Sequence, residues 1–394
     1  MVSSSMVMWG SFFSKQFYPT FFSAIFKSRA SFELCSFSNF LQSSISINSV
    51  ILAQNTYQSV ESLVFCTSEV RVTQCRFINC TSDHSGGGIS VGLCKHDIGR
   101  VTIIGSLFHS CSARTGGAFF LYSTTDINQR NCVINCKARK MDSAFESDHK
   151  VNSSSRFETM AIYNCGLEGS KQLFGFSSGI IRIYSFNITH NQHIDTSCLG
   201  TYMKGSFSVH TMNYMNNSGS YGFFFQSNSV YAMESCHILN NKFNHSLMSI
   251  YSLDSSQVIK IYASMILGNH IKNVEPDPST NLQVVIYEYC FSDRDLNYVN
   301  GKNAIANIIN PCELINDLSY TLPPMNNICP TLTPHAIEPS GHNVVLFFIF
   351  GSALVAIIIS TALIIHKAKQ MNKLKTWFSA EESSCLNNDR LVLD

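Results

Sequence analysis

Apolar residues follow one recurring pattern between about residues 70 and 270. Apolar side chains alternate with polar ones, the alternation slips by one residue before a small residue, and a polar residue followed by Cys or Asn closes the pattern. Alternation with a period of two places every second side chain on the same side of the backbone, so the pattern predicts short β-strands. A slip that recurs at the same place indicates two strands that meet at a bend or bulge. The central apolar residues of the clear copies are Phe77, Phe108, Ile188, Tyr214, Ile238 and Ile266, and weaker copies are centred on Leu52, Val133 and Ile162.

The spacing of the copies predicts how they pack. Successive centres lie 24 to 31 residues apart, and a unit of that size built from short strands buries its apolar face only by stacking on its neighbours. The sequence therefore predicts an all-β fold, a parallel β-solenoid in which each copy forms one coil. Because parallel crossover connections are right-handed in most proteins, we expect a right-handed parallel β-helix.

The last position of the pattern forms a column of its own, consisting of Asn55, Cys80, Cys111, Cys136, Cys165, Asn191, Asn217, Asn241 and Asn269. Stacked asparagines at strand spacing predict an amide ladder, in which each side chain donates to the next coil. Stacked cysteines lie within disulfide reach, which predicts the pairs Cys80–Cys111 and Cys136–Cys165. An inert column of small buried thiols is the alternative.

One segment predicts a membrane anchor. Residues Val344–Ile365 contain no charge over a length that spans a bilayer as a helix. Four lysines follow within ten residues, at positions 367, 369, 373 and 375, so the positive-inside rule places the C-terminus in the cytoplasm. This predicts a single-pass type I protein of the plasma membrane. A tail-anchored protein with a cytosolic body is the rival, and an apolar signal sequence is not evident at the start of this sequence.

The predicted organisation has six parts. These are a poorly defined N-terminal segment (1–29), β-helix repeats (30–270), a C-terminal cap (271–322), a Pro-rich stalk (323–343), the transmembrane helix (344–365) and a cytoplasmic tail (366–394).

Composition narrows the classes of function. The formal net charge is +1 and only 13% of residues are charged, so no nucleic-acid partner is expected. Fourteen of the fifteen cysteines precede the predicted transmembrane helix, which favours an oxidising compartment.

A family resemblance enters at residues 70–122. The run Cys75–Thr81, C-R-F-I-N-C-T, is followed by the glycines Gly86–Gly88 and by Ile89, and a second glycine pair begins at Gly116. This composite resembles the repeat of the polymorphic outer membrane protein family, with Phe77-x-Asn79 shortened from the usual spacing of that family. The resemblance implies a right-handed β-helical surface protein of the pectin-lyase-like kind, often adhesive. The bacterial members end in an outer-membrane barrel, so their secretion route does not carry over.

One charged column is a candidate site, and it consists of Asp83, Arg114, Arg139 and Glu168. Its balanced signs favour a surface salt ladder over the acid–base pair that a carbohydrate-active enzyme requires. No residue spacing indicates a metal or a cofactor, and no catalytic residue is predicted.

Glycosylation acceptors of the type Asn-x-Ser/Thr occur only before the predicted membrane helix. Asn152, Asn187 and Asn244 are predicted on loops or outward positions and are the expected sites. Asn79 and Asn216 fall on a position interpreted as facing inward, where a glycan would disrupt the packing.

The preferred function is recognition or adhesion at the cell surface, in which the coil loops bind glycans or proteins. A membrane-anchored lyase or hydrolase and a structural surface-coat protein are the alternatives. Within the membrane helix, Ser352, Ala356 and Ser360 recur every fourth residue, which would allow a homodimer.

Overall fold

The structure is a computed structural model. It describes residues 5–16, 21–23, 29–47, 69–92, 99–166, 172–176, 179–193, 197–202, 205–226, 230–251, 258–272, 283–293, 296 and 304–309. The chain divides into two compact units, Met1–Thr331 and Leu332–Asp394. All described residues belong to the first unit.

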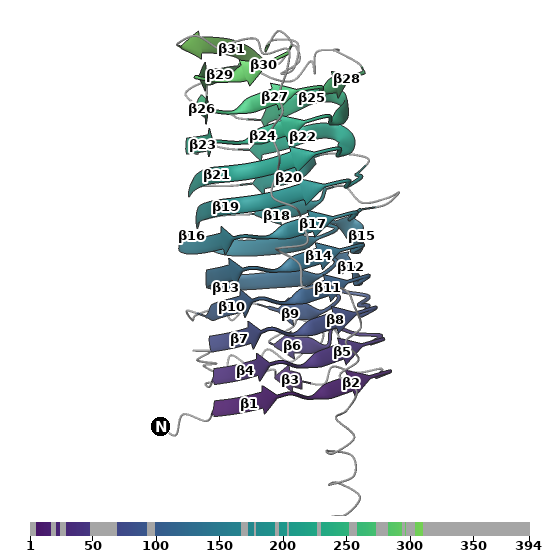
Figure 1. Cartoon of the computed structure of the whole chain (residues 1–394). Helices are drawn as coiled ribbons and strands as arrows, with labels where there is room; N and C mark the ends of the chain where they lie inside the picture. The colour runs from purple at the N-terminus through teal and green to yellow at the C-terminus, as the bar shows by residue number, and fades with distance from the viewer. Residues whose placement is uncertain are drawn as a thin grey trace, which may run out of the picture. The chain divides into compact units, whose positions relative to one another are not determined.

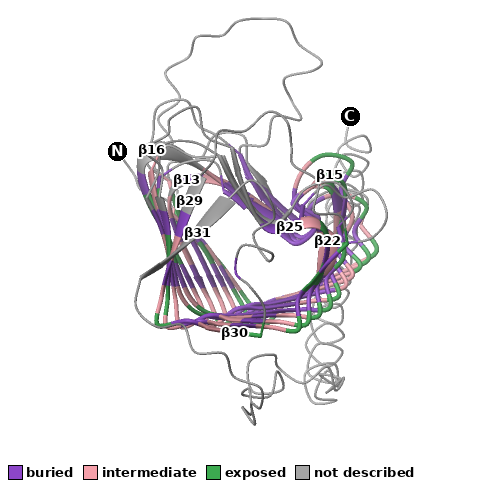
Figure 2. Ribbon diagram, turned by 90° about the horizontal axis from the view of Figure 1, so that it is seen from above, coloured by how far each residue is buried: buried purple, intermediate pink, exposed green. Residues whose placement is uncertain are grey.

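The described strands form a parallel β-solenoid (Figure 1). One 29-stranded sheet winds through the unit, and each turn of the chain, called a coil here, places its strands directly on those of the coil before. The strands lie on three faces, as the view along the axis shows (Figure 2).

The first face contains β1 (Ser5–Trp9), β4 (Arg29–Glu33), β7 (Glu69–Thr73), β10 (Arg100–Ile104), β23 (Val230–Glu234), β26 (Val258–Tyr262), β29 (Gln283–Glu288) and β31 (Ala304–Ile309). The second face contains β2 (Phe12–Ser14), β5 (Ser36–Ser38), β8 (Arg76–Ile78), β11 (Leu107–His109), β14 (Cys132–Ile134), β17 (Ala161–Tyr163), β24 (His237–Leu239), β27 (Met265–Leu267) and β30 (Phe291–Ser292). The third face contains β3 (Phe21–Ser23), β6 (Ile45–Ile47), β9 (Ile89–Val91), β18 (Phe174–Phe176), β20 (Ser197–Tyr202), β22 (Ser218–Gln226) and β25 (Lys242–Tyr251).

Four long strands join two faces. The strands β13 (Phe119–Gln129) and β16 (Phe145–Glu158) begin on the third face and end on the first face of the next coil. The strands β19 (Gly179–Thr189) and β21 (Gly205–Met215) run from the first face to the second. Short strands β12 (Ser112–Thr115), β15 (Lys137–Met141) and β28 (His270–Ile271) pair beside the third face.

The predicted interior row is confirmed. On the second face the paired, fully buried residues are Phe37, Phe77, Phe108, Val133, Ile162, Ile188, Tyr214, Ile238 and Ile266. The prediction of a copy centred on Leu52 is wrong. The residue that pairs with Phe77 in the preceding coil is Phe37, and Leu52 lies outside the described residues. The long insertion between these coils hides the Phe37 copy from a search for an even spacing.

The predicted slip is a tight corner in the backbone. Between the first and second faces one residue per coil has a positive φ near 55°, for example Leu34, Gln74 and Thr159. A second row of positive φ values, which includes Asn79 and Asn216, marks the corner between the second and third faces. A single left-handed residue turns the chain and shifts the alternation by one position.

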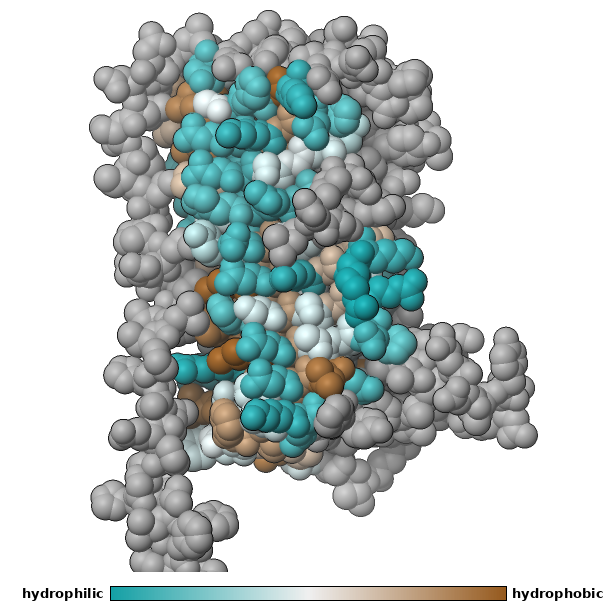
Figure 3. All heavy atoms as spheres, turned by 90° about the vertical axis from the view of Figure 1, so that its right-hand side faces the viewer, coloured by the Kyte–Doolittle hydropathy of each residue, from teal (hydrophilic) through white to brown (hydrophobic). Residues whose placement is uncertain are grey.

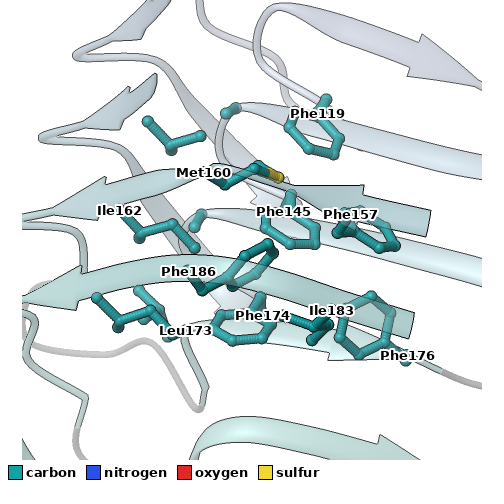
Figure 4. Close-up of a cluster of buried hydrophobic side chains, with 14 of the residues drawn as sticks. Phe119, Phe145, Phe157, Met160, Ile162, Leu173, Phe174, Phe176, Ile183 and Phe186 are labelled. Atoms are coloured by element: carbon teal, nitrogen blue, oxygen red, sulfur yellow. The ribbon is translucent and has the colours of Figure 1, made fainter. Parts of the chain in front are cut away.

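The core is a continuous stack of apolar side chains along the axis. Buried residues line the inside of the solenoid in Figure 2. The rings of Phe37, Phe77 and Phe108 stack with centroids 5.0 and 4.8 Å apart, and Phe119 and Phe145 on the third face stack at 4.7 Å. Figure 4 shows this aromatic packing around Phe145. Each coil therefore buries what its neighbour cannot bury alone.

The described strands also continue the solenoid beyond the predicted limits of the repeats. The strand β1 pairs with β4 upstream of residue 30, and β29 pairs with β26 and β31 downstream of residue 270. The division into a cap, a stalk, a membrane helix and a tail remains a prediction.

Candidate functional site

A row of polar and aromatic side chains projects from the first face, and each member directly precedes the left-handed residue at the corner to the second face. Its members lie on successive coils and pair directly with one another. We call the row the outer ladder, and it consists of Gln129, Glu158, Tyr184, His210, Glu234 and Tyr262.

Contacts between coils join most of the outer ladder. Gln129 Nε2 donates to Glu158 Oε2 at 2.7 Å, and the Tyr184 and His210 rings stack with centroids 5.2 Å apart. His210 Nδ1 lies 2.9 Å from Glu234 Oε2. These side chains are partly exposed, and Tyr262 is 41% exposed.

A cation lies against the ladder. Arg156, which points outward two residues before Glu158, forms an ion pair with Glu158 and places its guanidinium 5.3 Å from the centre of the Tyr184 ring. The ladder is thus a surface that is already ordered, with aromatic rings, carboxylates and one amide at the spacing of the coils. An ordered surface loses less side-chain entropy when a ligand binds.

The buried corner column matches the predicted amide ladder. Asn191, Asn217, Asn241 and Asn269 are buried, and the first three donate through Nδ2 to the Oδ1 of the next coil at 2.9, 3.2 and 2.9 Å. Each Nδ2 also donates to a main-chain carbonyl of the preceding coil, as Asn217 does to Ile188 at 3.0 Å. The prediction of an amide ladder is confirmed.

The predicted disulfides Cys80–Cys111 and Cys136–Cys165 are not formed. Cys80, Cys111, Cys136 and Cys165 are free, buried thiols in the structure. Hydrogen bonding to the Cys111 thiol and burial raise the pKa of Cys80, and burial raises the pKa of Cys111 and Cys136. A thiol held protonated in this way is a poor nucleophile for disulfide formation, which fits the alternative of an inert column.

One cysteine outside that column is bonded. Cys132 points outward from β14, is fully buried and forms a disulfide.

The predicted charged column forms only in part. Arg139 Nη2 lies 2.5 Å from Asp83 Oδ1, reaching across the intervening coil, and both side chains are exposed. This hydrogen bond from Arg139 lowers the pKa of Asp83. Arg114 is exposed and forms no ion pair among the described residues, and Glu168 lies outside them.

The acceptor asparagines fall in unexpected places. Asn244 is exposed, as predicted. Asn187 is only 5% exposed, and it lies between its paired residues Ala161 on β17 and Asn213 on β21. Asn79 and Asn216 lie at the second corner and are exposed, which corrects the inward position assigned to them. Figure 3, which views the side where β12 and β15 lie, shows mainly hydrophilic residues among those described there. The side chain of Asn152 lies outside the described residues.

A group of carboxylates that the sequence reasoning missed lies on the third face. Asp142 is 1% exposed, and Gln172 Nε2 donates to its Oδ1 at 2.6 Å. Glu146 and Asp148 point outward from β16 beside it, paired with Phe120 and Tyr122 of the preceding coil. Burial and the nearby Asp148 raise the pKa of Glu146 to about 7, and burial and Glu146 raise the pKa of Asp142.

This pair does not fit an acid–base site for a bound polysaccharide. General acid–base chemistry requires a carboxyl within hydrogen-bond reach of the substrate, whereas Asp142 is covered and the Glu146 Oε2 is buried. The position could have been found from the turn, since Asp142 takes the left-handed place of Gly116 in the preceding coil. Aspartate is one of the few residues that tolerate that conformation.

A second polar cluster lies inside the same coils. Asp126 faces the interior between Val101 and Ser155, is fully buried, and accepts hydrogen bonds from Ser123 and from Ser147 at 2.6 Å. Hydroxyl donors of this kind allow a carboxylate to remain in an apolar core.

Two further predictions concern metal binding and a membrane-spanning helix. Among the residues that the structure describes, no group of three or more His, Cys, Asp or Glu side chains could hold a metal ion. Within the same part of the chain no helix is long and apolar enough to span a bilayer, and the predicted segment Val344–Ile365 lies outside it.

Fold and surface together define a class of protein, a parallel β-solenoid with an ordered exterior ladder. Comparison of the chain with protein-family models, with curated proteins and with solved structures gives no match.

Proposed function

We propose that this chain is a single-pass type I cell-surface protein whose solenoid binds extended glycans along the outer ladder. In this proposal residues 344–365 cross the plasma membrane and residues 366–394 lie in the cytoplasm. The solenoid is a right-handed β-helix like that of the polymorphic outer membrane protein repeat.

The observation that carries the proposal is the continuity of the outer ladder. Tyr184 and His210 offer the partly exposed edges of two stacked rings, and Glu158 and Glu234 offer carboxylate oxygens on the coils beside them. Sugars present both apolar C–H faces and hydroxyl donors, so aromatic rings next to carboxylates suit them. A row that repeats at about 4.8 Å per coil matches an extended chain better than a compact ligand.

The test is binding of the purified full chain in detergent to a glycan array. We expect the double variant Tyr184→Ala/His210→Ala to lose at least about tenfold in affinity, because two stacked rings are removed. Lys242→Ala changes an exposed side chain away from the ladder and serves as the control. Equal binding by wild type and the double variant would contradict the glycan role of the ladder.

Topology needs its own measurement. Protease protection on intact cells expressing the chain with a C-terminal tag should digest the solenoid from outside and leave the tag intact. Protection of the solenoid would favour the tail-anchored arrangement and would contradict a surface role.

A further inference from the structure

The acceptor asparagines whose side chains are exposed lie along one edge of the solenoid. Asn79 and Asn216 occupy the second corner, between the second and third faces. Asn244 lies just past the same corner on β25, four residues after the corner residue Asn240. Asn187, in contrast, lies on the second face itself and is only 5% exposed. The fold therefore sorts the acceptors by position, which the sequence alone cannot do.

The two corner asparagines have room for a bulky substituent. Asn79 and Asn216 are exposed and take a left-handed backbone, with φ of 51° and 53°. Asn79 Nδ2 donates to Asn39 Oδ1 at 3.3 Å, a contact that one amide proton can maintain. The corner residues on the neighbouring coils are polar and exposed or partly exposed, namely Asn39, Ser110, His190 and Asn240. A group attached to either Nδ2 therefore extends into solvent.

The sequence supplies the second group that N-glycosylation needs, a hydroxyl two residues after the asparagine. Thr81 serves Asn79, and Ser218 serves Asn216. In the fold, Thr81 Oγ1 already donates to the Phe40 carbonyl at 3.0 Å. Sugar transfer to Asn79 therefore precedes the closing of this coil, and the fold determines only whether the product is tolerated.

The same product at Asn187 is incompatible with the fold. Asn187 on β19 lies between its paired residues Ala161 and Asn213. Both Asn187 and Thr189, the hydroxyl residue of this acceptor, are buried. Because buried sites in proteins are close-packed, an oligosaccharide on this amide would force its neighbours apart. Folded molecules therefore carry no sugar at Asn187.

We propose that the second corner is the glycosylated edge of the solenoid, with N-linked oligosaccharides on Asn79, Asn216 and Asn244 and none on Asn187. The inference rests on the proposed type I topology, which exposes these residues to the sugar donor, a lipid-linked oligosaccharide diphosphate. In the transfer, the bond from the anomeric carbon to the diphosphate oxygen breaks and a bond from that carbon to Nδ2 forms. The Nδ2 atom gives one of its two protons to the leaving diphosphate.

A glycosylated second corner leaves the outer ladder uncovered. The ladder residues project from the first face and directly precede the other corner of the second face. Sugars on the second corner cover the side where β12 and β15 lie, which is mainly hydrophilic among the described residues (Figure 3). One edge is thus shielded, and the edge proposed to bind glycans stays accessible.

The experiment is expression of the full chain in eukaryotic cells, followed by glycosidase-shift gels and mass spectrometry of the glycopeptides. Asn79→Asp and Asn216→Asp remove the acceptor but keep a residue that tolerates the left-handed corner. We expect each of these variants, and Asn244→Gln, to lose one oligosaccharide, seen as one step on the gel. The control is Thr189→Val, which keeps the shape of the side chain, removes the acceptor at Asn187 and should leave the number of oligosaccharides unchanged.

Two results would overturn the inference while leaving the topology intact. One is a wild type whose solenoid is digested from outside in the protease-protection assay but whose Asn79 or Asn216 glycopeptide carries no sugar. The other is a folded chain with sugar on Asn187. A solenoid that is protected from protease and carries no sugar at any acceptor contradicts the type I topology, and the inference falls with it. The failures of the two proposals are therefore told apart.

Discussion

The two halves of the solenoid fill the same buried corner with different chemistry. In the first half the column consists of thiols, and Cys111 Sγ contacts the Phe77 carbonyl of the preceding coil at 3.4 Å. In the second half it consists of amides, and Asn217 accepts from both the backbone N and the Nδ2 of Asn191 at 3.0 and 2.9 Å. A thiol is a small apolar group with weak hydrogen bonds, whereas each amide depends on its neighbours. One position of the fold can thus be filled either by independent groups or by a cooperative network.

The largest expected effect breaks the network. Asn217→Ala removes the acceptor of two Asn191 donors, and it removes the Nδ2 donor to the Ile188 carbonyl. Asn241 Oδ1 keeps only the backbone N of residue 217 as a donor. We expect a loss of about 3–5 kcal/mol in the free energy of unfolding, because several buried groups lose partners at once.

The matched change in the thiol half is Cys111→Ala, which removes one sulfur from a packed column. We expect a loss of only about 1 kcal/mol. Chemical denaturation of both full-chain variants measures the difference. Equal losses would contradict the distinction between a network and independent groups.

A pH effect of intermediate size separates the halves in another way, because the buried acid pair lies only in the thiol half. Folding raises the pKa of Glu146 to about 7 and raises that of Asp142 as well. A carboxyl with a raised pKa favours the folded state while it is protonated. Stability should therefore be highest near pH 4–5 and fall by roughly 2–3 kcal/mol as the pH rises through 7.

The control for the pH effect is Glu146→Gln, which cannot ionise. The slope of stability against pH between 5 and 8 should become shallower in this variant. If the variant and wild type show the same slope, the acid pair is not the cause.

A smaller effect tests the boundary between the halves. The backbone N of Cys165 already donates to Asn191 Oδ1 at 2.8 Å. Cys165→Asn would add its Nδ2 to that oxygen and extend the amide ladder by one coil, so stability should change by less than about 1 kcal/mol. The same substitution at Cys111 places an amide among thiols and should destabilise the protein more. Urea denaturation of the two variants gives the order, and the reverse order would contradict the role of neighbours.

The smallest effect concerns the surface. The side chains of Arg139 and Asp83 are 69% and 83% exposed, so their ion pair is screened by solvent. Arg139→Ala should leave the melting temperature unchanged within error. A clear loss would show that the predicted charged column has a structural role.

The sequence predicted the elements that depend on local periodicity. The alternation, the corner slip and the Asn column follow from residues within one coil, and the structure has all three. The coil around Phe37 was missed because Phe37 lies 40 residues before Phe77, outside the spacing of the other copies, although its local pattern matches.

The candidate surfaces were harder to predict because they depend on register between coils. Tyr184 and His210 lie 26 residues apart in the sequence and stack only when two coils align. Likewise, Asp142 and Glu146 look like ordinary turn and strand residues until Gln172 and Gly175 of the next coil are placed on them. That alignment depends on the lengths of the segments that connect the coils. These lengths differ from coil to coil and cannot be read from the alternation of apolar residues.

The stacking of the coils is tested directly by an experimental structure of the full chain, from electron cryomicroscopy or crystallography. We expect Phe77, Phe108, Ile188, Tyr214 and Ile238 to lie in one interior row. The coils of Val133 and Ile162 lie between those of Phe108 and Ile188, and the other members are on consecutive coils. A structure in which these residues lie in unrelated surroundings would contradict the stacking of coils and, with it, the outer ladder.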